Sequence, residues 1–226
     1  MKTLGMIGGT SWHSTIAYYQ LINEKAGEKT GNLENPPIIL HSINIALMRE
    51  QNRDKINAKY LDVSNKLVEA GAEAIIICAN TPHMAYDHVQ PKLSVPILHI
   101  AEATGKEAQR LGLRKLGLLG TKPTMTGTFI TDMLKNKFVI ESIIPSTEHL
   151  DQTHRFISEE LTQGVFSKEA RTFFTQQMDE LQYRGAEGII LGCTELPILF
   201  QDITYPLPLL ATTELHADMA VEFIFS

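Results

Sequence analysis

Cysteine and tryptophan are scarce in this chain, whose 226 residues include two cysteines and one tryptophan. Two cysteines cannot build a disulfide framework, so small disulfide-stapled secreted folds are excluded and a reducing cytoplasm is the expected compartment. No apolar run is long enough to span a membrane. The N-terminal segment MKTLGMIGGT is also too short and glycine-rich for a signal peptide.

Runs of basic residues are missing as well. The net charge is −6 and the charged residues are mixed in sign along the chain, so neither nucleic acid nor an anionic membrane is an expected partner. The GxGxxG, GxxxxGK and GxSxG patterns are absent, and the eight histidines show no metal-ligand spacing. A nucleotide site, a serine hydrolase and a metal centre are therefore not expected, and a small molecule is the favoured partner.

Short apolar runs alternate with segments of helical period along the whole length. A chain with 43% hydrophobic and 20% charged residues suits a folded soluble protein, and this alternation is typical of parallel sheets wrapped by helices. The predicted fold class is therefore α/β. The expected strands are 3–7, 38–43, 74–78, 95–99, 115–119, 138–141, 188–192 and 207–210.

Helices are predicted from apolar residues that recur on one face and from a glycine that ends the segment. The clearest is 54–70, where the face is followed by Gly71; its members are Ile56, Tyr60, Val63 and Leu67. Others are predicted through Ala170, Phe174, Met178 and Leu181 before Gly185, through Leu150, Ile157 and Leu161 before Gly164, near 101–111, and along Leu215, Met219 and Phe223. The aromatic residues Trp12, Tyr18 and Tyr19 are expected to pack.

The sequence contains one supersecondary unit twice. LVEAGAEAIIICAN at 67–80 matches LQYRGAEGIILGCT at 181–194, LGMIGG at 4–9 matches LGLLGT at 116–121, and VPIL at 95–98 matches LPLL at 207–210. Chance likeness of apolar strands could explain one block, but three in order favour two homologous lobes. We predict a first lobe of 1–99 plus 211–226, a second of 100–210, and an active site in the cleft between them.

Four polar segments follow strands, where open parallel sheets bind ligands: GGTS at 8–11, ANTPH at 79–83, GTKPT at 120–124 and GCTE at 192–195. Thr81 and Thr194 are expected to cap helices. The thiol of Cys193 would then be more acidic near a helix N-terminus, the alternative being an inert buried cysteine. Cys78 should face away from the cleft into the core, because strand side chains alternate. Of the histidines, His83 alone is kept as a candidate site residue.

In these segments the chain resembles the aspartate/glutamate racemase family, close to its aspartate racemase branch. The matching stretches are MIGGTSWHSTIAYYQLIN at 6–23, ANTPH at 79–83, LLGTKPTM at 118–125 and GAEGIILGCTELP at 185–197. The resemblance implies two α/β lobes with the active site between them, a homodimer, and interconversion of amino-acid enantiomers without pyridoxal phosphate or metal. It also implies two bases, one cysteine on each lobe.

The resemblance implies a role for each residue that matches a site position of the family. Cys193 resembles the catalytic cysteine of the second lobe, with Thr194 and Glu195 contacting the ammonium and carboxylate region of the substrate. The expected substrate-binding residues on the other segments are Asn80 and Thr81 for the α-carboxylate, Thr10 and Ser11 in the first-lobe loop, Thr121 and Thr124 in the hydroxyl loop, and Gln51, with Arg53, toward the distal carboxylate. A solvated surface arginine is the alternative for Arg53.

One position departs from the family pattern. The repeat aligns Ala79 with Cys193, and Ala79 stands where the first-lobe cysteine is expected. A methyl group cannot accept or donate a proton, so Cys193 is left as the acid/base, with water or His83 as the candidate second acid. We predict a cofactor-independent racemase of aspartate- or glutamate-like substrates, with reduced or one-sided activity. The alternatives are a single-cysteine lyase or isomerase, or an impaired amino-acid-binding protein.

Overall fold

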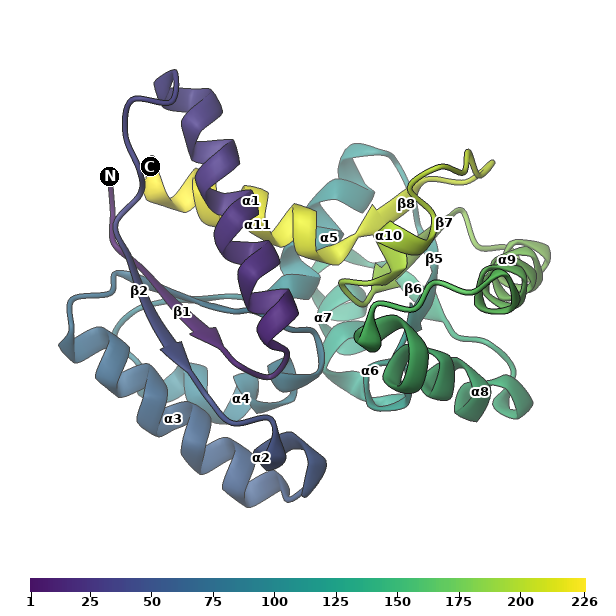
Figure 1. The fold of residues 1–226 in the computed structure, drawn as a ribbon, viewed down its shortest axis with the longest axis horizontal. Helices are drawn as coiled ribbons and strands as arrows, with labels where there is room; N and C mark the ends of the chain where they lie inside the picture. The colour runs from purple at the N-terminus through teal and green to yellow at the C-terminus, as the bar shows by residue number, and fades with distance from the viewer. The chain divides into compact units, whose positions relative to one another are not determined.

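The computed structural model describes residues 1–226, which form two compact units (Figure 1). The first unit comprises Met1–Ile100 and Thr213–Ser226, and the second comprises Ala101–Thr212. Each unit is built on a four-stranded parallel sheet flanked by helices, which confirms the predicted α/β class. None of the helices is both long and apolar enough to cross a membrane.

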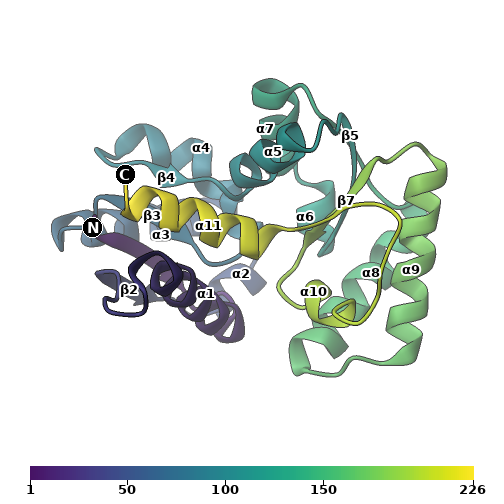
Figure 2. The same cartoon turned by 90° about the horizontal axis from the view of Figure 1, so that it is seen from above.

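The first unit has the strand order β2-β1-β3-β4. One face of its sheet packs on α1 and α11 through a core that includes Met6, Tyr18 and Ala217, and the other face packs on α3. Both chain ends belong to this unit and lie close together in Figures 1 and 2. The Lys2 N–H donates to the Ile224 carbonyl at 2.8 Å. Its elements are β1 Leu4–Gly8, α1 Trp12–Thr30, β2 Ile38–Ser42, α2 Ala46–Arg49, α3 Arg53–Glu69, β3 Ala74–Ile77, η1 Thr81–Ala85, α4 Tyr86–Val89, η2 Gln90–Lys92, β4 Ile97–Leu98 and α11 Thr212–Ile224.

The second unit repeats this topology with the order β6-β5-β7-β8. A core of aromatic and aliphatic side chains lies between its sheet and α9, and on the opposite side Gly105 of α5 packs closely on Phe138 of α7 (Figure 2). Its elements are α5 Ile100–Arg110, β5 Lys115–Gly120, α6 Lys122–Thr126, α7 Thr128–Phe138, β6 Glu141–Ile143, η3 Thr147–His149, α8 Leu150–Arg155, η4 Phe156–Glu160, η5 Leu161–Gln163, α9 Lys168–Tyr183, β7 Gly188–Gly192, α10 Leu196–Leu199 and β8 Leu209–Ala211.

The register of the two sheets follows the sequence repeat. Leu4 lies opposite Ala74 in the first sheet, and Leu116 lies opposite Gly188 in the second. These are the pairs that the repeat places in equivalent positions. Strand order reverses between β1 and β3, and between β5 and β7, which is where doubly wound sheets bind ligands beyond the strand ends.

Two expectations about elements are wrong in detail. The strand expected at 138–141 lies at Glu141–Ile143, because α7 continues to Phe138 and Val139 then ends it in the left-handed region at φ 58°. The predicted face of the last helix holds only in part: Met219 is buried and Phe223 packs against the core, whereas Leu215 is half-buried. The helix also buries His216, Ala217, Ala220, Val221 and Ile224. Ala217 and Ala220 belong to the core cluster that α11 shares with the sheet, and a pattern read from the larger apolar residues alone does not mark them.

The predicted packing of the aromatic residues near the N-terminus holds for one of three. Tyr18 is buried, whereas Trp12 is 62% and Tyr19 is 51% exposed. Three histidines, His83, His99 and His216, are buried in the same unit. Residues of α3 behave as predicted, since Ile56, Tyr60, Val63 and Leu67 are all buried.

Candidate functional site

The segments after β1 and β3 form what we call the first half-site, within the first unit. In the loop after β1, Gly9 has φ 89°, and a Cβ there would lie 2.0 Å from the Ile43 carbonyl oxygen. A side chain is therefore excluded, and the loop turns tightly enough for the Gly9 N–H to donate to the Thr15 hydroxyl at 2.9 Å. This turn places Thr10 and Ser11 at the start of α1.

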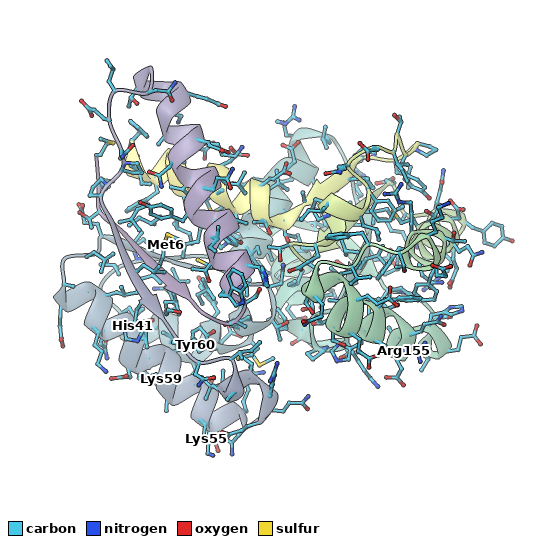
Figure 3. All side chains as sticks on the ribbon, viewed as in Figure 1. Met6, His41, Lys55, Lys59, Tyr60 and Arg155 are labelled. Carbon is cyan, nitrogen blue, oxygen red and sulfur yellow. The ribbon has the colours of Figure 1, made fainter.

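Both hydroxyls of this loop are already held by the protein. The Ser11 hydroxyl accepts from the Ser14 N–H at 3.2 Å and caps α1. The Thr10 hydroxyl lies 2.9 Å from that of Tyr60. Figure 3 shows Tyr60 on the side of α3 that faces the sheet, with Lys55 on the solvent side. Thr10 is thus tied to a buried residue of α3, and Ser11 serves α1.

The segment after β3 carries the two residues on which the predicted mechanism depends. Cys78 is buried among the core residues of the α1 and α11 side, and burial raises the pKa of its thiol. This confirms that Cys78 belongs to the core. Its carbonyl accepts from the Ser14 hydroxyl at 2.7 Å. Ala79 follows half-buried, Asn80 is buried and Thr81 is half-buried.

The expected cap at Thr81 is wrong. The helical turn η1 begins at Thr81 itself, and Asn80 is its N-cap without a side-chain capping bond. Pro82 falls in the first turn, where its missing N–H is tolerated. The turn is a 3-10 helix, so its backbone closes more tightly than an α-helix.

His83 lies in this turn and is fully buried. Its Nδ1 lies 2.9 Å from the Ala79 carbonyl oxygen, and its Nε2 accepts from the Ile100 N–H at 3.3 Å. Burial lowers the pKa of His83 to about 4, because the charged imidazole loses hydration. Near pH 7 the ring is neutral, and both nitrogens are engaged by backbone.

Gln51 lies on the connection between α2 and α3, and Arg53 is the first residue of α3. Gln51 is exposed at φ 50°, in the left-handed region. The Arg53 guanidinium donates to the carbonyl of Met84, within η1. Arg53 is therefore not simply a solvated side chain, since it ties this connection to the segment after β3.

The segments after β5 and β7 form the second half-site, within the second unit. The Cys193 thiol donates to Glu195 Oε2 at 2.8 Å, and the Thr194 hydroxyl donates to the same oxygen at 2.7 Å. Cys193 is half-buried and Glu195 is buried. One carboxylate oxygen thus accepts two hydrogen bonds from its immediate neighbours.

This contact overturns the expected acidity of Cys193. Burial and the adjacent Glu195 carboxylate raise the pKa of the thiol well above its ordinary value, because a thiolate beside a carboxylate is repelled. The helix that was expected to lower the pKa, α10, spans only Leu196–Leu199, and Thr194 does not cap it. Its dipole is therefore too short to outweigh the carboxylate.

The hydroxyl loop packs directly on this strand end. Thr121 and Thr124 have their hydroxyl oxygens 3.0 Å apart, and Thr124 is fully buried. A Cβ added at Gly120 would meet Thr124 at 3.0 Å, and one added at Gly192 would meet it at 3.4 Å. The two segments of the second half-site are therefore in contact, and glycine at the ends of β5 and β7 makes this approach feasible.

Comparison with known proteins identifies the family. The model of the Asp/Glu/Hydantoin racemase family matches residues 7–220 of the chain. This chain belongs to the Asp/Glu/Hydantoin racemase family. The match spans both half-sites, and it supports amino-acid racemase activity for this family member.

Relatives of this racemase-family chain match over nearly its full length. A broad specificity amino-acid racemase of Bacillus subtilis is 23% identical over 223 residues, which cover 96% of each chain. Among solved structures, one from Yersinia pestis assigned as an Asp/Glu racemase is 35% identical with a TM-score of 0.93. An aspartate racemase homologue from Pyrococcus horikoshii is 33% identical with a TM-score of 0.88. Both structures cover 100% of this chain and are themselves covered completely.

Three contacts of this family member were not foreseen from its sequence. They are the direct bond of Glu195 to the thiol, the bond of Tyr60 to Thr10, and the burial of His99 and His216 beside His83. A histidine at the end of the apolar run VPILHI was a usable signal for His99. Nothing in the local sequence marks Tyr60 as a site neighbour, because its position fits an ordinary core face.

Proposed function

We propose that this protein is a cofactor-independent amino-acid racemase acting on aspartate- or glutamate-like substrates in the reducing cytoplasm. Cys193 is its acid/base. The observation that carries the proposal is the hydrogen bond from the Cys193 thiol to Glu195 at 2.8 Å. It places a proton acceptor beside the one half-buried thiol of the chain.

The Glu195 contact gives the thiol a route to its reactive form. The thiolate, rather than the thiol, removes a proton from carbon. Because the thiol pKa is raised, Cys193 is protonated in the resting protein and its proton must leave first. Glu195 is positioned to accept it, so Glu195 acts as the base that generates the thiolate.

The chemical step then follows from acid/base balance. The thiolate takes the α-proton, the Cα–H bond breaks, and the electron pair moves into the substrate carboxylate to form an enediolate. Donors from Asn80 and Thr194 stabilise that charge. A proton added to the opposite face of Cα gives the other enantiomer. A positioned acid/base group contributes about 10²- to 10⁴-fold to such a step.

The second acid is water in this proposal. Ala79 offers no proton, and His83 is neutral with both ring nitrogens bonded to backbone. A buried imidazole whose pKa is about 4 is neutral near pH 7, and its remaining N–H is too weak an acid to protonate the substrate. Because water is poorly positioned compared with a second thiol, we expect turnover to be reduced or faster in one direction.

The test is exchange of the α-proton in heavy water, followed by proton NMR and chiral analysis for both enantiomers of aspartate and glutamate. Exchange with inversion supports racemisation. Exchange with retention, from one enantiomer only, means that the site has one working base. If the protein binds an amino acid but exchanges the α-proton of none, it is an amino-acid-binding protein and the racemase proposal is wrong.

Two cysteine variants serve as a matched pair in the same assay. Cys193→Ser is expected to abolish exchange, because a hydroxyl is too weak an acid and base here. Cys78→Ser is expected to leave the exchange rate within about threefold, because that thiol lies in the core and touches no substrate group. Loss of activity in the Cys78 variant with retained folding would reverse the assignment.

A further inference from the structure

Three histidines are buried together in the first unit. His83, His99 and His216 are 0%, 1% and 0% exposed, and the ring centroid of His83 lies 4.7 Å from that of His99 and 5.4 Å from that of His216. They come from η1, the residue after β4, and α11. No group of three His, Cys, Asp or Glu side chains in the chain is arranged to hold a metal ion. Burial of polar ring nitrogens is costly unless they are hydrogen-bonded, and those of His83 and His216 are.

The hydrogen bonds of His83 assign its tautomer. Nδ1 lies 2.9 Å from the Ala79 carbonyl oxygen and 3.2 Å from that of Asn80. Carbonyl oxygens only accept, so Nδ1 carries the hydrogen. Nε2 accepts from the Ile100 N–H. The neutral ring therefore satisfies three backbone groups at once.

His216 holds the neighbouring strand in a similar way. Its Nε2 donates to the Leu98 carbonyl at 2.7 Å, and its Nδ1 accepts from the Tyr18 hydroxyl at 2.9 Å. Leu98 ends β4, and Ile100 follows it by two residues. One histidine thus joins the end of β4 to α1 and α11, and His83 joins the same region to the turn after β3.

The two carbonyls bound by His83 determine the orientation of two amides. In a trans peptide the C=O and N–H groups point in opposite directions. Holding the Ala79 carbonyl toward the imidazole therefore turns the Asn80 N–H away from it. The Asn80 carbonyl orients the Thr81 N–H in the same way. Asn80 and Thr81 are the residues assigned above to the α-carboxylate of the substrate.

We propose that His83 is a positioning residue that fixes the turn from Ala79 to Thr81 for carboxylate binding, with His216 holding the strand end on which His83 depends. The inference rests on the proposed function of Asn80 and Thr81. His83 does not exchange protons with the substrate. Its contribution is geometric, and a displacement of about 1 Å at such a site costs on the order of 10²-fold.

Two substitutions separate the contacts of His83. His83→Asn retains an amide donor at the position of Nδ1, whereas His83→Gln places its amide at the position of Nε2 and loses the bond to the two carbonyls. We expect His83→Gln to raise KM by about tenfold to a hundredfold with a smaller change in kcat. The Asn variant should restore most of the affinity. A proton-transfer role predicts instead a loss of kcat in both variants, and would overturn the inference.

A second measurement does not require turnover. Hydrogen–deuterium exchange of the 79–84 segment should be faster in His83→Gln than in wild type and His83→Asn, while the thermal midpoints of the two variants stay close. The control is His88→Asn, because His88 is exposed on α4 and its Nε2 lies 2.7 Å from Lys92 Nζ, away from the 79–81 turn. It should change neither KM nor exchange.

The failures of the two proposals are distinguishable. If the wild type binds aspartate by calorimetry but does not exchange its α-proton, the racemase function fails while the segment measurement still tests His83. If exchange of 79–84 in His83→Gln equals that of wild type, the positioning role fails whatever the activity. Equal loss of affinity in the Asn and Gln variants would also overturn it.

Discussion

Cys193 and Glu195 show how two neighbouring residues change each other's chemistry. A thiol at the end of a parallel strand was expected to be acidic, yet the Glu195 carboxylate 2.8 Å away and burial both raise its pKa. The raised pKa keeps the resting thiol protonated, which suits a group that must both take and return a proton. From the same contact we expect slow reaction of the thiol with alkylating agents near neutral pH.

Replacing Glu195 by Gln tests that pairing. Removing the carboxylate removes the repulsion of the thiolate, so the thiol pKa should fall and alkylation by iodoacetamide should reach half its maximal rate at lower pH. Racemisation should fall by about 10²-fold or more, because no base is left to take the thiol proton. Thr194→Val, which keeps the carboxylate, is the control for the alkylation profile alone, because Thr194 is itself assigned to the substrate. An unchanged alkylation profile in the Gln variant would refute the assignment.

Ala79 gives the converse experiment at the residue scale. Installing cysteine there supplies the missing second thiol in the aligned position of the repeat. We expect Ala79→Cys to increase racemisation relative to one-sided exchange, measured as the ratio of inversion to deuterium incorporation. A Cys78→Ser background keeps the neighbouring core thiol from confusing the result. A lower ratio in the variant would contradict the view that Ala79 occupies the position of a missing second base.

At the scale of elements, the site depends on helices that end or begin where strands stop. Tyr60 of α3 holds Thr10, and Tyr18 of α1 holds His216 of α11. These contacts link side chains that are distant in sequence. The positions of Thr10 and His216 therefore depend on α3 and α1 being folded. The start of α3 is fixed by Asn52, whose side chain accepts from the Lys55 N–H at 3.0 Å.

Removing that cap should weaken α3 measurably. Asn52→Ala is expected to lower the free energy of unfolding by about 1 kcal/mol, measured by urea titration. Asn65→Ala, on the exposed face of the same helix, should be neutral or slightly stabilising because alanine is the better helix former. Equal effects of the two substitutions would show that the cap is energetically unimportant.

The buried histidines predict a pH dependence of stability. The pKa of His83 is lowered to about 4 and that of His216 is also lowered, from about 6.5 in the unfolded chain. The unfolded chain therefore binds more protons between these values, and stability rises with pH from about 4 to 6.5 and is then level. For His83 alone, the free energy of unfolding measured by urea titration should be about 3 kcal/mol lower at the acid end of this range than at its upper end. His83→Gln should flatten the curve, and an unchanged slope would argue against a neutral buried ring.

At the scale of the whole molecule, the expected assembly is a homodimer. The chain has a mass of 25.2 kDa, so sedimentation equilibrium at micromolar concentration should give about twice that mass. A monomer over the whole concentration range would contradict the expectation, which comes from the family resemblance. The division into a first lobe of 1–99 plus 211–226 and a second of 100–210 likewise stays a prediction about independent structural domains.

Much of the architecture was predictable because it depends on local pattern. Alternating apolar runs and helical faces placed all eight strands, with the sixth displaced where Val139 adopts a left-handed conformation. The repeat gave the correspondence of Ala79 with Cys193, and strand alternation placed Cys78 in the core. The helix ends at Thr81 and Thr194 were less predictable, because backbone hydrogen bonds and not residue preference decide where a short turn begins.

The sequence by itself determined the α/β class, the duplicated unit, the family and the candidate chemistry at Cys193, since each rests on the order and spacing of residues. Only the tertiary structure decided how those residues act. It raised the pKa of Cys193 through Glu195, and it buried His83 with His99 and His216. The physical reason is that a pKa and a hydrogen-bond partner depend on burial and on distances of a few ångströms between atoms, and residue spacing alone does not specify these.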